Sequence, residues 1–470
     1  MAHNRHGGTK AKMDWDWRYW PSTPITPAIG DISAVLGHSN HPELEDPQSI
    51  VWGLAQCEGM TEATAVIDVL DIVGTDVTWK HGLEDAELES MVAVITKRKL
   101  AASSLAKRSF SVFFLNTLRS REGWLPGNFS FSAHTLRTLQ KAGLSSMVLD
   151  AIFTKSGYGS KMRNQCSTQR EVTGELKSFE VCYRYICGWE AGISFTQFLR
   201  TQYQTVYFCI NYPPAALCRL RVKLEKRVQI AYRDFFLDAL SADESLRAWE
   251  IDIGVRREQL FDYERKYDVE VMNLDVTTRE LHRLSKDWNS LGQDCQDQAL
   301  QLDFLASTYG KYLETMNEVQ CPWEVDKSYD MRESFEVLKS QCNNYYRWTI
   351  AHRERTNIRI NLLFHLSAQQ EARTSKEIAE FSARIAEQTQ RDSASMITIA
   401  AVTMLFLPGS FISAVLSTIF FDYGEDSLRI SKEWWILPAT AIPTTLIVFA
   451  IWLVWRWQRV QKQNVARQGR

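Results

Sequence analysis

The sequence predicts an α+β protein with an N-terminal α/β cytoplasmic domain, a long helical stalk and two C-terminal transmembrane helices, the first of them continuous with the stalk. Three observations lead to this fold class. Strand-like and helical runs alternate within residues 51–220. Residues 323–407 contain neither glycine nor proline, and two long apolar runs without a charge begin at residues 393 and 434.

Composition narrows the class of protein. Among 470 residues, 54 lysines and arginines nearly balance 56 aspartates and glutamates, which gives a net charge of −2. A nucleic-acid binder would usually carry a basic domain. The mean hydropathy of −0.26 argues against a protein made mostly of membrane spans. The nine cysteines include no Cys-x-x-Cys pair, which predicts idle thiols in a reducing compartment rather than disulfides or a zinc site.

Residues 1–50 are expected to be a disordered or loosely attached leader. Five of the twelve prolines lie between residues 21 and 47, a composition that does not build a core. The start of the chain lacks the apolar centre of a secretory signal, and its acids Asp14 and Asp16 are unusual in a mitochondrial presequence.

Residues 51–220 are expected to form a mixed α/β domain. A helix is predicted over residues 133–153. Apolar, β-branched and aromatic runs predict strands at residues 91–96, 110–115, 179–186 and 206–212. The sequence holds no phosphate-cradling glycine-rich loop, no His-Glu-x-x-His and no nucleophile elbow, so we expect neither an enzyme nor a bound cofactor.

Residues 221–322 are expected to be an acidic helical region. Between residues 243 and 336 the sequence holds 22 acids and 11 bases, a net charge of −11. A solvated acidic face is the usual meaning of such a run. The alternative is weak binding of divalent cations by carboxylates that neighbouring subunits bring together.

Residues 323–392 are expected to be a stalk helix that enters the first span without a break. Residues 323–407 alone, 85 in all, would make a helix about 130 Å long at about 1.5 Å per residue. Ile378, Phe381 and Ile385 recur at spacings of three and four and form one apolar face. This face must pack on other helices, either from neighbouring copies in an oligomer or from its own chain.

Two segments are predicted to cross a membrane. Residues 393–421 are 29 positions without a charge and residues 434–455 are 22 more, whereas about 20 suffice to span a bilayer. A buried core hairpin is the soluble alternative. The loop 422–433 has four acids and two bases, and the tail 456–470 has five bases and no acid.

The positive-inside rule places this basic tail in the cytoplasm, and two spans then place the N-terminal body on the same side. A two-pass protein with both termini in the cytoplasm is therefore expected. The plasma membrane is favoured because no organelle address is visible, with an organelle membrane as the alternative.

One face of the first span carries hydroxyl groups at a seven-residue repeat. The pore-lining candidates are Met396, Thr403, Leu407, Ser410, Ser413 and Ser417. They would line a hydrated path, or the small ones would simply let helices approach closely. In the loop, Asp422, Glu425 and Asp426 would attract cations to the mouth, or only keep the loop soluble.

The C-terminal half resembles the CorA-type metal-ion transporter family, most closely the fungal CorA-like proteins. The resemblance covers residues 220–460 and is strongest over residues 378–421, in the Leu407-Pro408 pair and in the second span with its tryptophan-rich ends. It implies a funnel-shaped homopentamer in which the first span lines the pore and the second forms an outer ring. It also implies transport of divalent cations of the Mg²⁺ type.

The sequence departs from the family at the pore mouth. Magnesium-carrying members end the first span with Gly-Met-Asn, whose asparagine oxygens hold the hydrated ion. The equivalent positions here are Ser417, Thr418 and Ile419. Isoleucine offers no oxygen and hydroxyl rings select less strongly, so Zn²⁺, Co²⁺ or Ni²⁺ join Mg²⁺ as transported or regulatory ions, and a Zn²⁺ exporter is a variant of the hypothesis.

The function predicted is divalent-cation transport through a pore lined by the first span. The expected partners are further copies of the chain, as a pentamer, and membrane lipid, with no nucleic acid. The alternative from another class is a non-conducting, membrane-anchored sensor or scaffold that acts through its cytoplasmic domain. In that case the departure from Gly-Met-Asn would mark lost transport.

Overall fold

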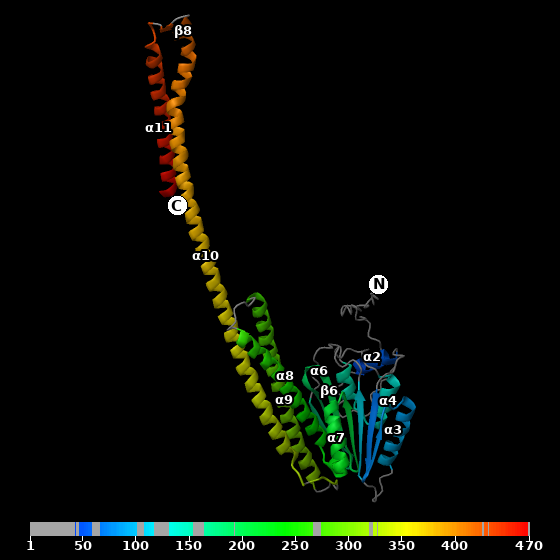
Figure 1. The fold of residues 1–470 in the computed structure, drawn as a ribbon. Helices are drawn as coiled ribbons and strands as arrows, with labels where there is room; N and C mark the ends of the chain where they lie inside the picture. The colour runs from blue at the N-terminus through cyan, green and yellow to red at the C-terminus, as the bar shows by residue number, and fades with distance from the viewer. Residues whose placement is uncertain are drawn as a thin grey trace, which may run out of the picture. The chain divides into compact units, whose positions relative to one another are not determined.

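The computed structural model describes residues 43, 47–58, 66–100, 108–116, 131–153, 164–191, 193–266, 274–318, 323–326, 328–424, 427–430 and 432–468. The predicted leader lies almost entirely outside these residues. The chain forms two compact units, residues 1–363 (unit 1) and 364–470 (unit 2). The fold is the expected mixture of an N-terminal sheet domain and a long helix that leads into a second apolar helix (Figure 1).

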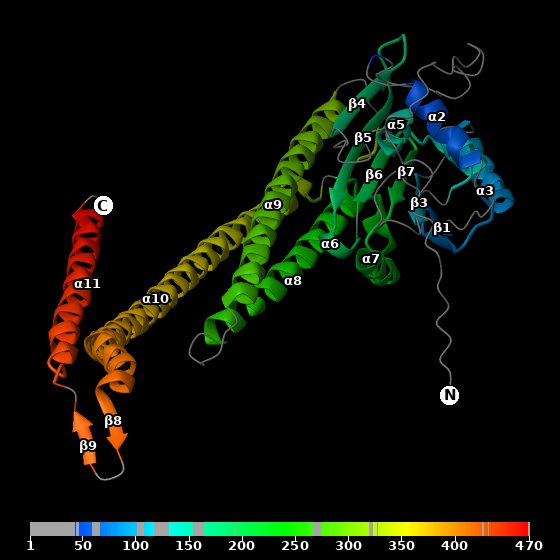
Figure 2. The ribbon, with the colours of Figure 1, turned by 90° about the horizontal axis from the view of Figure 1, so that it is seen from above.

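Unit 1 is built on a seven-stranded sheet with the strand order β2-β1-β3-β7-β6-β5-β4 (Figure 2). Its strands are β1 (Val66–Val73), β2 (Asp76–Lys80), β3 (Ser109–Asn116), β4 (Gln165–Arg170), β5 (Leu176–Ile186), β6 (Ile193–Arg200) and β7 (Gln204–Ile210). The neighbours pair antiparallel, except that β3 and β7 are parallel. The expected strands at residues 110–115, 179–186 and 206–212 correspond to β3, β5 and β7.

Helices cover both faces of this sheet (Figure 2). One face carries α2 (Pro47–Glu58), α3 (Asp85–Leu100), α4 (Ala133–Ala142) and α5 (Ser146–Ile152). The other carries α7 (Pro214–Lys226), α8 (Phe236–Lys266) and α9 (Leu274–Asn317), with the short α6 (Gly188–Ala191) and η2 (Val228–Tyr232) beside them. The central strands β3 and β7 are buried almost throughout, which explains their unbroken apolar runs.

The strand predicted at residues 91–96 is wrong, because these residues lie inside helix α3. The run is rich in β-branched residues, which favour strands as readily as they tolerate helices. Its buried members are Met91, Val92 and Ile95, and with Leu88 they fall three and four positions apart on one helical face. Asp85 and Glu87 in the first turn also favour a helix start.

The helix predicted over residues 133–153 is confirmed as helical but is two helices rather than one. Gly143 ends α4 in the left-handed conformation, with φ of 115°. A Cβ at this position would also lie 2.7 Å from a methyl carbon of Leu199. The hydroxyl of Ser145 then accepts from the backbone N–H of Met147 and starts α5.

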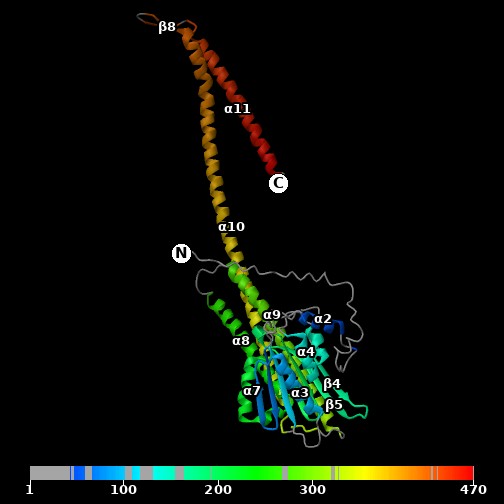
Figure 3. The ribbon, with the colours of Figure 1, turned by 90° about the vertical axis from the view of Figure 1, so that its right-hand side faces the viewer.

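The acidic region is helical, as expected, and α9 packs along the first part of α10 (Met331–Phe420) (Figures 1 and 3). Between the two helices, the indole Nε1 of Trp288 donates to Thr356 Oγ1 at 3.1 Å. Nearer the start of α10, Cys342 Sγ donates to the carbonyl of Cys295 at 2.9 Å. These buried contacts join the sheet domain to the start of the long helix.

The uninterrupted stalk is confirmed, since α10 is a single helix of 90 residues that reaches into unit 2. Unit 2 also contains α11 (Ile436–Gln468), which begins two positions after the start of the second predicted span. The connecting loop holds a small antiparallel hairpin that the sequence did not indicate. Its strands are β8 (Phe421–Gly424) and β9 (Ser427–Ile430).

Candidate functional site

The C-terminal part of α10 and most of α11 are long and apolar enough to cross a membrane, and their most apolar windows contain no buried residue. Along α10, the side chains of Ile399, Phe406 and Phe411 are 65%, 67% and 69% exposed. Apolar surface of this extent is stable only in lipid or against other protein. The two helices therefore support the prediction of a membrane protein.

The pore-lining candidates are accessible in this chain where their side chains are described. Met396, Thr403, Leu407 and Ser410 are exposed, and Ser413 is half-buried. Thr403 Oγ1 donates to the carbonyls of Ile399 and Ala400, at 2.9 and 3.0 Å, and Ser410 Oγ donates to Leu407 O at 3.0 Å. Because the hydroxyl hydrogens stay within the helix, the oxygen lone pairs are left to accept from water or to bind a cation.

Pro408 adds a further oxygen to the same stretch of α10. It lies inside the helix and has no backbone N–H, so the carbonyl of Met404 lacks its usual helical donor. Such carbonyls are tolerated at membrane depth where they line a water-filled cavity or meet a polar group. Met404 lies between Thr403 and Ser410 in the chain.

The predicted selectivity and mouth residues lie where side chains are not described. Ser417, Thr418 and Ile419 belong to the last turn of α10, and Asp422 belongs to β8, but only their backbone is placed. Glu425 and Asp426 lie outside the described residues altogether. The roles assigned to these six residues therefore stay predictions.

The stalk face is open to solvent in the single chain. Ile378, Phe381 and Ile385 are 61%, 64% and 47% exposed. Charged residues elsewhere on the helix pair at the i,i+4 spacing, such as Arg391 with Glu387 at 2.7 Å. The apolar stripe is thus flanked by polar surface, as is typical of a face that another molecule covers.

Many carboxylates of the acidic region are already paired with arginines of the same chain. Arg219 contacts Asp243 and Glu244 at 2.6 and 3.0 Å, and Arg355 contacts Glu264 at 2.6 Å. Within the part of the chain that the structure describes, no group of three or more His, Cys, Asp or Glu side chains is placed to hold a metal ion. Cation binding by carboxylates from several subunits stays a prediction.

A buried polar centre joins the sheet to α8 and α9. Tyr183 and Tyr207, from β5 and β7, donate their hydroxyls to the two carboxylate oxygens of Asp238 at 2.5 and 2.7 Å. Burial raises the pKa of Asp238 from its usual 3.8 to about 6, although both tyrosine hydrogen bonds oppose this rise.

One turn earlier on the chain, Asp234 holds two guanidinium groups. It pairs with Arg108 and lies 3.8 Å from Nε of Arg200, whose side chain is fully buried. Tyr312 of α9 donates its hydroxyl to the second carboxylate oxygen at 2.7 Å. Burial lowers the pKa of Arg200, and the nearby Arg108 lowers it further, while Asp234 opposes both effects. The Asp234 carboxylate therefore stabilises the buried positive charges of Arg108 and Arg200 in the folded protein.

The carboxyl of Asp238 makes the stability of unit 1 depend on pH. Since its pKa is higher in the folded than in the unfolded chain, its contribution is complete below pH 4 and is lost as pH rises through about 6. Two pKa units correspond to roughly 3 kcal/mol. Asparagine does not titrate, so we expect Asp238→Asn to lack this loss of stability between pH 4 and pH 7. The measurement is the free energy of urea unfolding of variant and wild type at both pH values, compared as their difference. An identical difference at both pH values would contradict the assignment.

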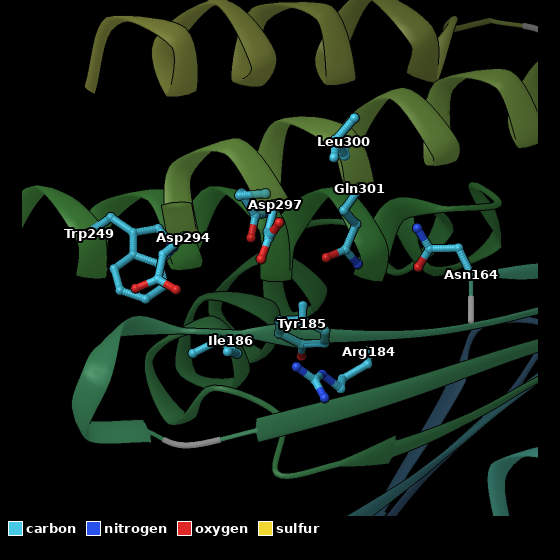
Figure 4. A pocket seen from close by; sticks show the side chains of 10 residues that line it. Asn164, Arg184, Tyr185, Ile186, Trp249, Asp294, Asp297, Leu300 and Gln301 are labelled. Carbon is cyan, nitrogen blue, oxygen red and sulfur yellow. The ribbon is translucent and has the colours of Figure 1, made fainter. Parts of the chain in front are cut away.

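An open cavity of about 220 Å³ lies between the end of β5 and helices α8 and α9 (Figure 4). It is lined by both polar and apolar residues: Asn164, Arg184, Tyr185, Ile186, Trp249, Asp294, Asp297, Gln298, Leu300 and Gln301. The edge strand β4 begins opposite Cys182, so the last residues of β5 have no β4 partner among the described residues. Trp189 Nε1 donates to Asp294 at 2.8 Å and fixes one side.

The sequence interpretation missed both the buried polar centre and this cavity. The sequence did contain a local sign of the buried polar centre, namely charged residues next to apolar runs. Arg200 ends an apolar strand, and Asp234 and Asp238 flank the apolar residues 235–237. A charge within such a run needs a buried partner. The cavity gave no signal, because its residues come from four separate segments.

Comparison with known proteins gives distant likenesses. No protein-family profile matches the chain. A 59-residue stretch is 39% identical to the notoamide biosynthesis cluster protein M′ of Aspergillus versicolor, and this stretch covers 12% of the present chain and only 13% of that protein.

Three solved structures are similar over much of the chain. The full-length CmaX protein is 14% identical, with a TM-score of 0.37 over 86% of this chain and 100% of that chain. The CorA magnesium transporter of Methanocaldococcus jannaschii is 10% identical, with a TM-score of 0.35 over 84% and 98%. The cytoplasmic domain of ZntB from Vibrio parahaemolyticus is 9% identical, with a TM-score of 0.38 over 65% and 98%. Values this low assign neither an ion nor a residue role to this chain.

Proposed function

We propose that this chain is a CorA-like integral membrane protein that carries divalent cations through a pore lined by the C-terminal part of α10. The observation that carries the proposal is one continuous helix whose apolar, exposed end bears Thr403 and Ser410 on one face. Residues seven apart stay on the same side of helices that pack in a left-handed bundle. Divalent cations are then cargo, not a resident cofactor.

A pore requires several copies of the chain. Each chain offers one hydroxyl-bearing helix, and a single helix does not enclose a path for ions. The exposed stripe Ile378, Phe381 and Ile385 supplies apolar surface through which copies would associate along the stalk. We propose a homo-oligomer, a pentamer by the resemblance to the CorA family, with both chain termini in the cytoplasm and membrane lipid around α11.

Passage through such a pore is passive. Moving a divalent ion with the membrane potential yields roughly 4.6 kcal/mol per 100 mV, twice the value for one charge. Neutral hydroxyl and carbonyl oxygens are suitable ligands for the hard Mg²⁺ ion or for its hydration shell. Because no carboxamide ring is expected at Ser417–Thr418–Ile419, we expect weak discrimination among Mg²⁺, Co²⁺, Ni²⁺ and Zn²⁺.

The test is cation uptake into liposomes that contain the purified full-length protein, with each of the four ions and an imposed potential. We expect saturable uptake that increases with the potential. Thr403→Leu with Ser410→Leu should lower it at least tenfold, because two rings of hydroxyls become apolar and dewet the path.

The matched control is Thr440→Leu with Thr444→Leu in α11, whose hydroxyls also donate to their own helix. This control should leave uptake unchanged. Equal uptake by the wild type and the α10 variant would refute the pore assignment. No uptake of any of the four ions by a verified oligomer would refute transport and favour the sensor or scaffold.

A further inference from the structure

We infer that the cavity between β5, α8 and α9 binds a small primary amine as its ammonium ion, with Asp294 as the counter-ion and the carboxamides of Gln298 and Gln301 as hydrogen-bond acceptors. The cavity lies wholly within unit 1, so the inference does not depend on the proposed pore. Its volume of about 220 Å³ is below the usual 300–1,000 Å³ of pockets for drug-sized ligands, which indicates a small ligand.

One face of α9 supplies the polar wall of the cavity. Asp294, Asp297, Gln298 and Gln301 are separated by three or four residues or lie next to each other, and a helix places such residues on one side. Figure 4 shows Asp294, Asp297 and Gln301 extending from α9 toward β5. All four side chains carry oxygen atoms that accept hydrogen bonds, so this wall can bind a ligand that donates.

The charges that line the cavity leave one carboxylate without a cation. Burial lowers the pKa of Arg184 on β5, and the nearby Asp297 carboxylate raises it, so these two opposite charges stabilise each other. Asp294 accepts a hydrogen bond from Trp189 Nε1 at 2.8 Å, yet no cationic side chain in the described part of the chain forms an ion pair with it. The lining residues therefore carry an excess negative charge at Asp294.

The arginine nearest to this arrangement is committed to other partners. Arg256 stacks on the ring of Trp189, but it pairs with Asp252 and Asp287. Burial is the main cause that raises the pKa of Asp294, whereas the hydrogen bond from Trp189 lowers it and neighbouring carboxylates raise it again. A ligand cation would stabilise the ionised form that this environment disfavours.

Two buried carboxamides point independently to a ligand. Gln298 and Gln301 are only 5% and 6% exposed, and neither side chain has a hydrogen-bond partner among the described residues. Buried side-chain polar groups normally have a partner in the protein or an ordered molecule beside it. Because both side chains line the cavity, a ligand that carries N–H groups would supply the partner that each of them lacks.

A primary ammonium ion matches this set of groups. It carries one positive charge and three N–H donors, which suit one carboxylate and two carboxamide oxygens. Ile186 and Leu300 add apolar surface to the lining, which suits a short alkyl chain. The guanidinium of Arg184 would repel a second positive charge, so we expect a monoamine.

A metal ion matches the cavity less well. Hard cations such as Mg²⁺ and Ca²⁺ bind through several oxygen ligands, usually with more than one carboxylate. Within the described ranges, no group of three or more His, Cys, Asp or Glu side chains is placed to hold a metal ion. The guanidinium of Arg184 also lies beside one of the two carboxylates that the cavity offers.

The experiment is saturation-transfer difference NMR of butylammonium chloride with the full-length protein in a non-ionic detergent, after subtraction of the signal from detergent alone. We expect saturable binding. Butanol, which lacks the charge, and sodium butanoate, which reverses it, should bind at least tenfold more weakly. KCl and MgCl₂ at the concentration of the amine should leave its signal unchanged. These comparisons use the wild-type protein alone, so they do not depend on how any variant folds.

Variants then locate the site. Asp294→Asn keeps an acceptor for Trp189 but loses the charge, and Gln301→Leu keeps the bulk but loses the acceptor; each should weaken binding of butylammonium, the first at least tenfold. Asp303→Asn, on the same helix but paired with Lys339 outside the cavity, should bind like the wild type. The inference is overturned if butylammonium does not bind, if butanol binds as tightly, if KCl or MgCl₂ displaces the amine, or if either cavity variant binds it like the wild type.

Discussion

Asp234→Leu is expected to destabilise unit 1 by about 3–5 kcal/mol. The variant leaves Arg108 and the fully buried Arg200 beside each other without their shared carboxylate, and it removes the acceptor of Tyr312. Breaking a buried ion pair from one side costs more than the pair contributes, because the remaining charge stays desolvated. Urea unfolding of the full-length protein in detergent, followed by circular dichroism, measures the change.

The matched control is Asp303→Leu on α9. This residue pairs with Lys339 at 2.5 Å, but both side chains are largely exposed, at 51% and 39%. Exposed pairs contribute about 0–1 kcal/mol, so the control should unfold close to the wild type. If Asp234→Leu lowered the free energy of unfolding by less than about 1 kcal/mol, as the control does, other groups would have to stabilise the buried charges of Arg108 and Arg200.

The second large effect is expected on the assembly. Replacing Ile378, Phe381 and Ile385 together by serine should convert the oligomer into smaller species. Burying a large aliphatic or aromatic side chain contributes about 1.5–3 kcal/mol, and every copy in the assembly loses three of them. Mass photometry or light scattering in detergent reports the number of chains for wild type and variant.

The control for the stalk is the triple serine variant of Lys376, Glu380 and Glu387, which lie on the opposite side of α10 and are exposed. It should keep the wild-type number of chains. An unchanged assembly in the apolar variant would mean that the stripe does not join copies. A monomeric wild type would contradict the proposed oligomer and, with it, the pore.

The sequence by itself determined the parts that depend on neighbouring residues in the chain. The absence of glycine and proline predicted the uninterrupted α10, and the length of two charge-free runs predicted the apolar ends of α10 and α11. Dense apolar runs predicted β3, β5 and β7, because strands inside a sheet are buried on both faces. The hydroxyl repeat on α10 was also visible, since a helix places residues seven apart on one face.

Tertiary structure alone decided what depends on distant residues. Residues 91–96 have strand-like composition, but packing of Leu88, Met91, Val92 and Ile95 against the sheet holds them in a helix. The charge of Arg200 is tolerable because Asp234, just before α8, lies 3.8 Å from it and because the distant carbonyl of Glu324 accepts from its guanidinium. The cavity combines side chains from β5, α8, α9 and the residue before β4, and no local pattern records such a meeting, because strand pairing and helix packing create it.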